Sequence, residues 1–186
     1  MLEDFIELTG YVTGNKIYIK YNDIKCIKQG ETMKLIAFKQ RDFDVLYSFM
    51  QPLWHETYGG FLSKEHIDRL LDCYFSPIAL KRYKSLGYEY YKLDNVGVLV
   101  FVDRGDYVYM DKLYLLPQAR GKGYPAFAFE QMAKRGKDIV LSANRQNARA
   151  LKCYQKNGFV IVEEKEIDFG NGMINYDYVL RKTITK

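Results

Sequence analysis

The stretch YVYMDKLYLLPQARGKGYPAFAFE, residues 107–130, decides the fold of this chain. Tyr107 to Leu116 is rich in aromatic and branched apolar residues, which favours a largely buried strand. Pro117 ends the strand because proline cannot donate to a ladder. From Tyr124 onward apolar residues recur at helical spacing. The stretch therefore predicts a strand, a turn and a helix in succession.

The turn itself carries glycines and positive charge. Gly121 and Gly123 allow a tight turn and a close approach of the backbone to a ligand. The first N–H groups of the following helix would point into this turn, and Arg120 and Lys122 add full charges. A phosphate or pyrophosphate fits such a site. A solvated basic connection between strand and helix explains the same residues, so the turn alone leaves both interpretations open.

A second stretch, IVLSANRQNARALKCYQKNGF at residues 139–159, predicts a short strand, a polar turn, a helix from about Asn147, and a stop at Gly158. Taken together, the two stretches resemble the GNAT superfamily of acyl-CoA-dependent N-acyltransferases over roughly residues 33–184. The resemblance rests on Gln118-x-x-Gly121-x-Gly123 followed by Asn147-x-x-Ala150-x-x-x-Tyr154-x-Lys156-x-Gly158-Phe159.

The rest of the chain predicts one main domain, residues 33–186, after a small β-rich extension, residues 1–32. The extension alternates apolar and polar residues between turns, and it is too small to bury a core alone. It must therefore pack on the main domain or pair with another chain, for example in a homodimer. The main domain is predicted to contain a strand at 35–38, helices at 42–53, from Ser63 and at 77–85, strands at 88–93 and 96–102, and a terminal hairpin at 160–167 and 174–180.

This order of elements predicts an α/β or α+β fold. The resemblance narrows it to a GNAT-type mixed sheet with helices on both faces. In the first helix Asp42 is the expected N-cap, and residues 54–61 are expected to form a loop.

Composition excludes several classes of protein. With 186 residues and a net charge of +5, the chain has neither a basic stripe nor a recognisable nucleic-acid module. Its three cysteines share no metal or disulfide spacing, so we expect reduced thiols, no metal and a cytoplasmic location. The acidic N-terminus does not resemble a signal peptide, and no apolar stretch is long enough to cross a membrane.

The resemblance implies acetyl-CoA as the acyl donor and identifies residues that would hold it. In this family the strand before the turn splays from its neighbour, here residues 139–143, and the pantetheine arm pairs with its free backbone. Main-chain groups of Leu113, Leu115 and Leu116 would contact the pantetheine, and the pyrophosphate would lie at Gln118, Arg120, Gly121, Lys122, Gly123 and Tyr124.

Asn147 matches the pantetheine-binding asparagine of the family, although it would also serve as a helix N-cap. Pro125 departs from the glycine or alanine that is frequent in the family. Because proline has no N–H group, one phosphate contact is lost.

The resemblance also implies the catalytic residues. Tyr154 matches the tyrosine that protonates the departing thiolate, a task suited to a phenol with a pKa of ~10; a buried tyrosine with a satisfied hydroxyl is the alternative. Asp111 is the candidate general base, predicted by strand alternation to lie on the same side as Leu113. Asp106 and Glu56 are alternative bases.

The acceptor would meet the predicted loop, where Trp54 and Tyr58 would line an aromatic pocket and Glu56 would attract a cationic amine; a locally packed aromatic loop is the alternative. The sequence thus predicts an N-acetyltransferase in which a primary amine of a small molecule or peptide attacks acetyl-CoA directly. The alternatives are a non-catalytic acyl-CoA-binding module that recruits a partner through residues 1–32, and a nucleotide-phosphate binder that uses only the turn.

Overall fold

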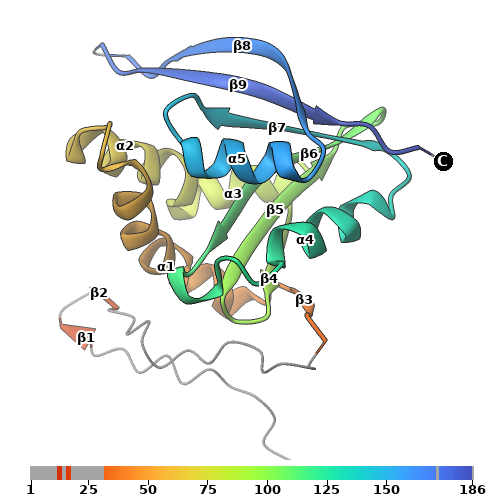
Figure 1. Ribbon diagram of the computed structural model, residues 1–186. Helices are drawn as coiled ribbons and strands as arrows, with labels where there is room; N and C mark the ends of the chain where they lie inside the picture. Colours follow the sequence, from red (N-terminus) through yellow and green to blue (C-terminus); the bar gives the residue numbers. More distant parts are fainter. Residues whose placement is uncertain (1–11, 14–15, 18–31, 171, 186) are drawn as a thin grey trace, which may run out of the picture.

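A seven-stranded mixed sheet forms the centre of the molecule (Figure 1). The structure is a computed structural model and describes residues 12–13, 16–17, 32–170 and 172–185. All neighbouring strands are antiparallel except β6 and β7, which are parallel. The strands, in their order across the sheet, are β3 (Leu35–Ala37), β4 (Glu89–Leu93), β5 (Gly97–Asp103), β6 (Tyr107–Leu115), β7 (Asp138–Asn144), β9 (Ile174–Lys182) and β8 (Val160–Asp168).

Helices cover both faces of this sheet, which confirms the predicted architecture. One face packs against α1 (Gln40–Tyr58), α2 (Lys64–Phe75) and α3 (Pro77–Ser85), and the other against α4 (Tyr124–Ala133) and α5 (Ala148–Lys156). A short 3₁₀ helix, η2 (Pro117–Ala119), leads from β6 into the glycine turn. None of the helices in the described part of the chain is long and apolar enough to cross a membrane.

The predicted N-terminal extension falls mostly outside the described residues. Within it, β1 (Val12–Thr13) and β2 (Lys16–Ile17) form an antiparallel pair. The division of the chain at residue 32 stays a prediction.

The first helix differs from its prediction at both ends. Asp42 is not the N-cap; it lies in the first turn, where its Oδ2 accepts the Lys39 N–H at 2.7 Å. Of residues 54–61, which were expected to form a loop, the first five continue α1 to Tyr58, and residues 59–61 form a turn. The helix contains Pro52, as its predicted range did. A proline in a helix interior costs ~3 kcal/mol, and burial of the next two side chains, Leu53 and Trp54, offsets that cost.

Other predicted helix starts are confirmed. The Ser63 hydroxyl accepts the His66 N–H at 3.1 Å at the start of α2. The Ser76 hydroxyl accepts the Ala79 N–H at 3.3 Å at the start of α3, with Pro77 in the first turn. Each cap satisfies a donor that the helix itself cannot.

The two parallel strands at the centre of the sheet diverge along their length. β6 pairs with β7 only from Tyr107, opposite Asp138, to Met110, opposite Leu141. Beyond that point β7 continues to pair with β9, whereas the edge of β6 that faces β7 has no partner strand among the residues that the structure describes. The predicted splay is therefore present.

The free edge presents alternate peptide groups of β6. The Leu116 N–H donates to the Val96 carbonyl oxygen at 2.8 Å, so this group faces β5. Because successive peptide groups of a strand point to opposite edges, those of Leu113 and Leu115 face the gap beside β7. Two of the three predicted main-chain contacts are thus available to a ligand, and the Leu116 amide is already used.

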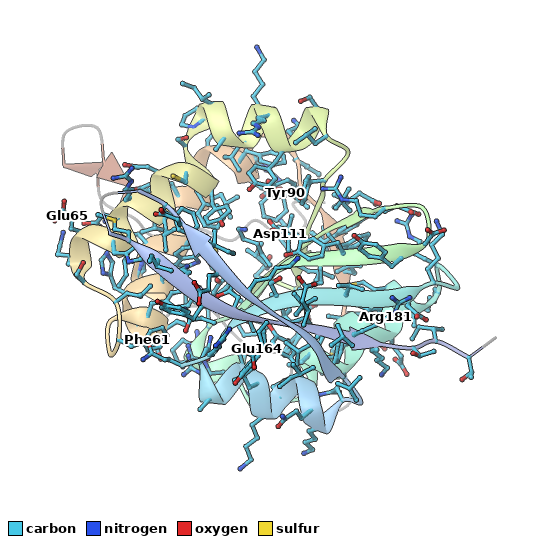
Figure 2. All side chains as sticks on the ribbon, turned by 90° about the horizontal axis from the view of Figure 1, so that it is seen from above. Phe61, Glu65, Tyr90, Asp111, Glu164 and Arg181 are labelled. Atoms are coloured by element: carbon cyan, nitrogen blue, oxygen red, sulfur yellow. The ribbon has the colours of Figure 1, made fainter. Side chains whose placement is uncertain are left out.

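A β-bulge interrupts β6 at Asp111. Met110 lies opposite Phe101 and Lys112 lies opposite Val100, so Asp111 is an extra residue without a partner on β5. A bulge shifts the alternation of side chains. The prediction that Asp111 shares a side with Leu113 is therefore wrong. Figure 2 shows Asp111 with Tyr90 on the side of the sheet that α3 covers.

Candidate active site

A cleft of about 340 Å³ lies where β6 and β7 diverge. It reaches from the α4–α5 face of the sheet to the α1–α2 face, because residues of both faces line it. From the first face come Leu113, Leu115, Gly121, Pro125, Asn147 and Tyr154; from the second come Trp54, Tyr58, Tyr74, Tyr109, Asp111 and Asp177. The gap in the sheet thus joins two half-sites.

The glycine turn forms one end of the cleft. Gly121 and Gly123 have φ values of 75° and 88°, in the left-handed region that glycine adopts without strain. Gly123 is the N-cap of α4 and Pro125 follows in the first turn, as predicted. Helix N-termini attract anions. The N-terminus of α4 has one N–H donor fewer, because proline lacks this group.

The structure brings only part of the predicted cofactor set to the cleft. Leu113, Leu115, Arg120, Gly121 and Asn147 line it. The other predicted residues lie outside the lining: Leu116, Gln118, Lys122, Gly123 and Tyr124. Tyr124, only 1% exposed, is part of the hydrophobic core.

Glu56 connects α1 to the turn by ion pairs. Its two carboxylate oxygens accept from Arg120 at 2.5 and 2.7 Å, and the Arg149 guanidinium lies 3.5 Å from the first of them. The hydrogen bond from Arg120 and its charge hold the pKa of Glu56 below the usual range. Glu56 thus already pairs with Arg120, the arginine that was predicted to bind a phosphate. Glu56 is not part of the cleft lining.

Two residues of the second motif lie together on α5. The Asn147 side chain accepts the Ala150 N–H at 3.1 Å, so it does cap the helix. Tyr154 lines the cleft while its ring packs against Phe129 and Phe159, with centroid distances of 6.1 and 5.8 Å. Burial raises the pKa of Tyr154, so its hydroxyl stays protonated at neutral pH.

The α1 side of the cleft is aromatic. The hydroxyls of Tyr58 and Tyr114 lie 2.7 Å apart, and the Trp54 ring packs against both tyrosines. Burial raises the pKa of Tyr58 to about 12, and the nearby carboxylates of Asp177 and Asp111 contribute to this rise. The predicted aromatic wall is present, although a helix and not a loop carries it.

The candidate general base is tied to a neighbour. Asp111 Oδ2 accepts from the Lys112 ammonium group at 2.7 Å, and Lys112 is only 6% exposed. The same ammonium lies 4.0 Å from the centre of the Tyr74 ring, a cation–π contact. Asp111 therefore serves first as the counter-ion of a buried lysine. Asp106, an alternative base, is exposed and is not part of the cleft lining.

Sequence reasoning missed several residues of the cleft. Asn175 and Asp177 come from β9, and Tyr74 and Tyr109 come from α2 and β6. Burial raises the pKa of Asp177, and the positive charge of Arg145 partly opposes this rise. Alternation along β9 puts residues 175 and 177 on one face of the strand. The sequence around them does not indicate that this face lies at the cleft.

No group of three or more His, Cys, Asp or Glu side chains within the described ranges is arranged to bind a metal ion. Cys153 lines the cleft, and burial raises the pKa of its thiol. A thiol with a raised pKa is a poor nucleophile at neutral pH.

Comparisons with known proteins agree with this geometry. Residues 46–159 match the model of the acetyltransferase (GNAT) family. The PaiA N-acetyltransferase of Thermoplasma acidophilum, solved with coenzyme A, is 22% identical with a TM-score of 0.61, over 82% of this chain and 99% of that one. The comparison with curated proteins returned no match.

Two further solved structures share the fold. The GCN5-related N-acetyltransferase of Rhodopseudomonas palustris is 19% identical, with a TM-score of 0.64, over 82% of this chain and 96% of that one. YncA of Salmonella typhimurium, solved with acetyl-CoA, is 15% identical, with a TM-score of 0.53, over 84% and 96%. Because the family match spans well over half of the chain, this protein belongs to the GNAT family of acetyltransferases.

Proposed function

We propose that this protein transfers an acetyl group from acetyl-CoA to a primary amine of a small molecule or peptide. The observation that carries the proposal is the cleft through the divergent strands, which joins a main-chain edge and a glycine turn on one face to aromatic and carboxylate side chains on the other. Such a passage allows a donor and an acceptor to meet from opposite faces of the sheet. Holding two reactants in this way converts their encounter into an intramolecular event.

The donor side is built for an extended arm that ends in phosphates. The free peptide groups of Leu113 and Leu115 would pair with the amides of a pantetheine arm. Gly121, the N-terminus of α4 and the guanidinium of Arg120 would receive the pyrophosphate. Asn147 remains available for the arm through the side-chain amide N–H₂, because only its oxygen caps α5.

The reaction then needs few groups. The neutral amine attacks the thioester carbonyl, a C–N bond forms, and a main-chain N–H of the free edge of β6 stabilises the oxyanion. As the C–S bond breaks, the Tyr154 hydroxyl donates its proton to the thiolate and regains one from the acceptor nitrogen. An acceptor that arrives as an ammonium ion also gives one proton to a base. The products are the amide, the free thiol and one proton.

Direct attack fits the chemistry of the cleft better than a covalent acetyl-enzyme. Cys153 is the cysteine in the lining, and its raised pKa keeps it in the unreactive thiol form.

Donor binding is the first test. Acetyl-CoA should raise the melting temperature, since a ligand that binds only the folded state stabilises it by ~2.7 kcal/mol at a hundred times its Kd. Adenosine diphosphate should bind more weakly than CoA, because the arm is absent. No shift at millimolar acetyl-CoA would contradict the proposal, and equal affinity for the diphosphate would favour a nucleotide-phosphate binder. Turnover would then be followed as thiol release over a panel of primary amines.

A further inference from the structure

Two buried oxygen atoms in the cleft have no hydrogen-bond partner. Asn175 and Asp177 both line the cleft, and the Oδ1 atom of each is enclosed with no donor among the described residues. The two residues are separated by one position on β9, so their side chains leave the same face of the strand. A buried acceptor without a donor costs ~1–3 kcal/mol, and more when it is charged. Two such acceptors on one face of β9 favour a ligand with several N–H donors.

The charges around these oxygens select the ligand further. Two carboxylates line the cleft, and Asp111 already pairs with the Lys112 ammonium group at 2.7 Å. Arg145 follows the end of β7 and pairs with Glu164 at 3.0 Å through one terminal nitrogen, while its buried Nε has no partner among the described residues. Its positive charge partly opposes the rise in the pKa of Asp177, but the two side chains form no ion pair. Lys165, the cross-strand neighbour of Asp177 on β8, has its ammonium group 3.7 Å from Glu163. Asp177 thus leaves one negative charge to be matched by a ligand.

The remaining walls around Asp177 are mostly apolar or aromatic. Burial raises the pKa of the hydroxyls of Tyr58 on α1, Tyr74 on α2 and Tyr109 on β6, and the charge of Asp177 adds a smaller part to each rise. Ile167 and Leu70 complete this part of the lining. Because Asp111 is already paired with Lys112, the described lining offers no second unpaired carboxylate to a second positive charge on the ligand. The surroundings therefore fit one cationic group attached to a hydrophobic body.

From this arrangement we infer that the acceptor is a primary amine with one positive charge and an apolar or aromatic body, and that Asp177 is the catalytic residue that receives its ammonium group and takes up its proton. The inference rests on the proposed acetyl transfer. The ammonium would donate to Asp177 Oδ1 and Asn175 Oδ1. One proton then moves from nitrogen to the carboxylate, and the neutral amine is left to attack. Burial brings the pKa of Asp177 closer to neutrality, where a base is more effective.

The experiment compares three probe amines on the whole chain. 2-Phenylethylamine carries one charge on an aromatic body, spermidine carries three charges, and glucosamine carries one charge on a polar body. We expect kcat/KM for 2-phenylethylamine to exceed that for each of the other two by at least about tenfold, because an unmatched charge or a buried polar group without a partner is unfavourable. A preference for spermidine or glucosamine, or no acetylation of any probe, would overturn the inference.

Two isosteric substitutions then separate the rival bases. Asp177→Asn should lower kcat/KM for 2-phenylethylamine by ~10²-fold or more and remove the acidic limb of its pH profile. Asp111→Asn is the matched comparison. When rates are compared per folded protein, it should lower kcat/KM less than Asp177→Asn does. A larger loss in Asp111→Asn, or an Asp177→Asn protein within threefold of the wild type, would reject the assignment.

A readout without turnover completes the design. In protein with ¹³C-labelled aspartate carboxyls, the resonance missing from Asp177→Asn should titrate above the usual aspartate pKa and shift on addition of 2-phenylethylamine. A resonance with an ordinary pKa and no response to the amine would count against the site. Stabilisation by acetyl-CoA is measured on the same samples, so a failed acceptor site is distinguished from a failed donor site.

Discussion

The ring of Tyr154 and its hydroxyl have separate environments, which allows them to be tested separately. The ring packs against Phe129 and Phe159, while the residue also lines the cleft. Tyr154→Phe preserves this packing and removes only the oxygen. An acid is needed as the C–S bond breaks and not in the ground state, so acetyl-CoA affinity should hardly change.

Turnover of Tyr154→Phe should fall by ~10²–10⁴, or about 3–5 kcal/mol of barrier. A structural role would instead cost ~1 kcal/mol of stability and leave the rate within a few fold. Single-turnover kinetics is the appropriate measurement, because slow product release would mask the effect in kcat. Tyr58→Phe is the matched control, since it removes a cleft hydroxyl that pairs with Tyr114.

Glu56 competes with phosphate for the guanidinium of Arg120. Its lowered pKa means that the ion pair is complete at neutral pH and is lost as the pH falls through that lowered value. Glu56→Gln should therefore tighten acetyl-CoA binding about two- to fivefold at pH 7, the range expected for a partly exposed pair. Titration calorimetry would measure this. Glu130→Gln, an exposed change on α4, is the control, and weaker binding by Glu56→Gln would mean that Glu56 orients Arg120 for the ligand.

The limits of sequence reasoning are clearest at single residues. Arg120 was predicted because a glycine turn is a local pattern, whereas Asn147 and Tyr154 were predicted because they match the motif of the resembled family. The structure brings all three to the cleft. Asn175 and Asp177 were not, because a strand pattern does not tell which face of a distant strand meets the site. The bulge at Asp111 also makes the predicted side of the sheet for this residue wrong. The bulge was not predicted because one extra residue does not change the apolar pattern of the strand.

At the level of elements, α1 shows how tertiary packing extends a helix beyond its predicted end. Its prediction ended before Trp54, yet the helix continues to Tyr58 and carries two aromatic side chains into the cleft. The elements around the glycine turn and α5 followed their predicted order because caps and breakers there agree with the packing.

Pro52 is exposed, so replacing it tests the cost of the proline directly. Pro52→Ala should raise the free energy of unfolding by about 1–2 kcal/mol, since the clash and the missing hydrogen bond are removed while some unfolded-state entropy is regained. Urea denaturation gives the number, and Gln51→Ala, an exposed change one residue earlier, should be nearly neutral. A less stable Pro52→Ala protein would contradict this prediction.

For the whole molecule, the periodicity of the sequence predicted only an α/β or α+β fold. The family resemblance predicted the mixed sheet with helices on both faces. Two hydrogen bonds of the main domain lie just after the predicted domain boundary at residue 32. Lys34 N–H donates to Asp94 Oδ1 at 3.1 Å, and the Lys34 carbonyl oxygen accepts the Asp94 N–H at 2.9 Å. These bonds tie the first residues of the main domain to the turn between β4 and β5.

Removing residues 1–32 should therefore leave a folded protein with an unchanged thermal shift on addition of acetyl-CoA and with turnover within a few fold of the full chain. Circular dichroism and thiol release are the measurements. Loss of turnover in a folded, acetyl-CoA-binding 33–186 protein would instead assign the extension a part in the reaction. Limited proteolysis of the full chain is an independent check, and the first cut should fall before residue 33 if the boundary is correct.

The passage between β6 and β7 also has a kinetic consequence. Because donor and acceptor would enter from opposite faces of the sheet, neither has to leave before the other arrives. Initial rates measured against one substrate at several fixed concentrations of the other should give double-reciprocal lines that intersect. Parallel lines would mean that an acetylated enzyme forms and releases CoA before the amine binds. Intersecting lines would mean that both substrates are bound at once and that transfer occurs in a ternary complex across the gap between the two strands.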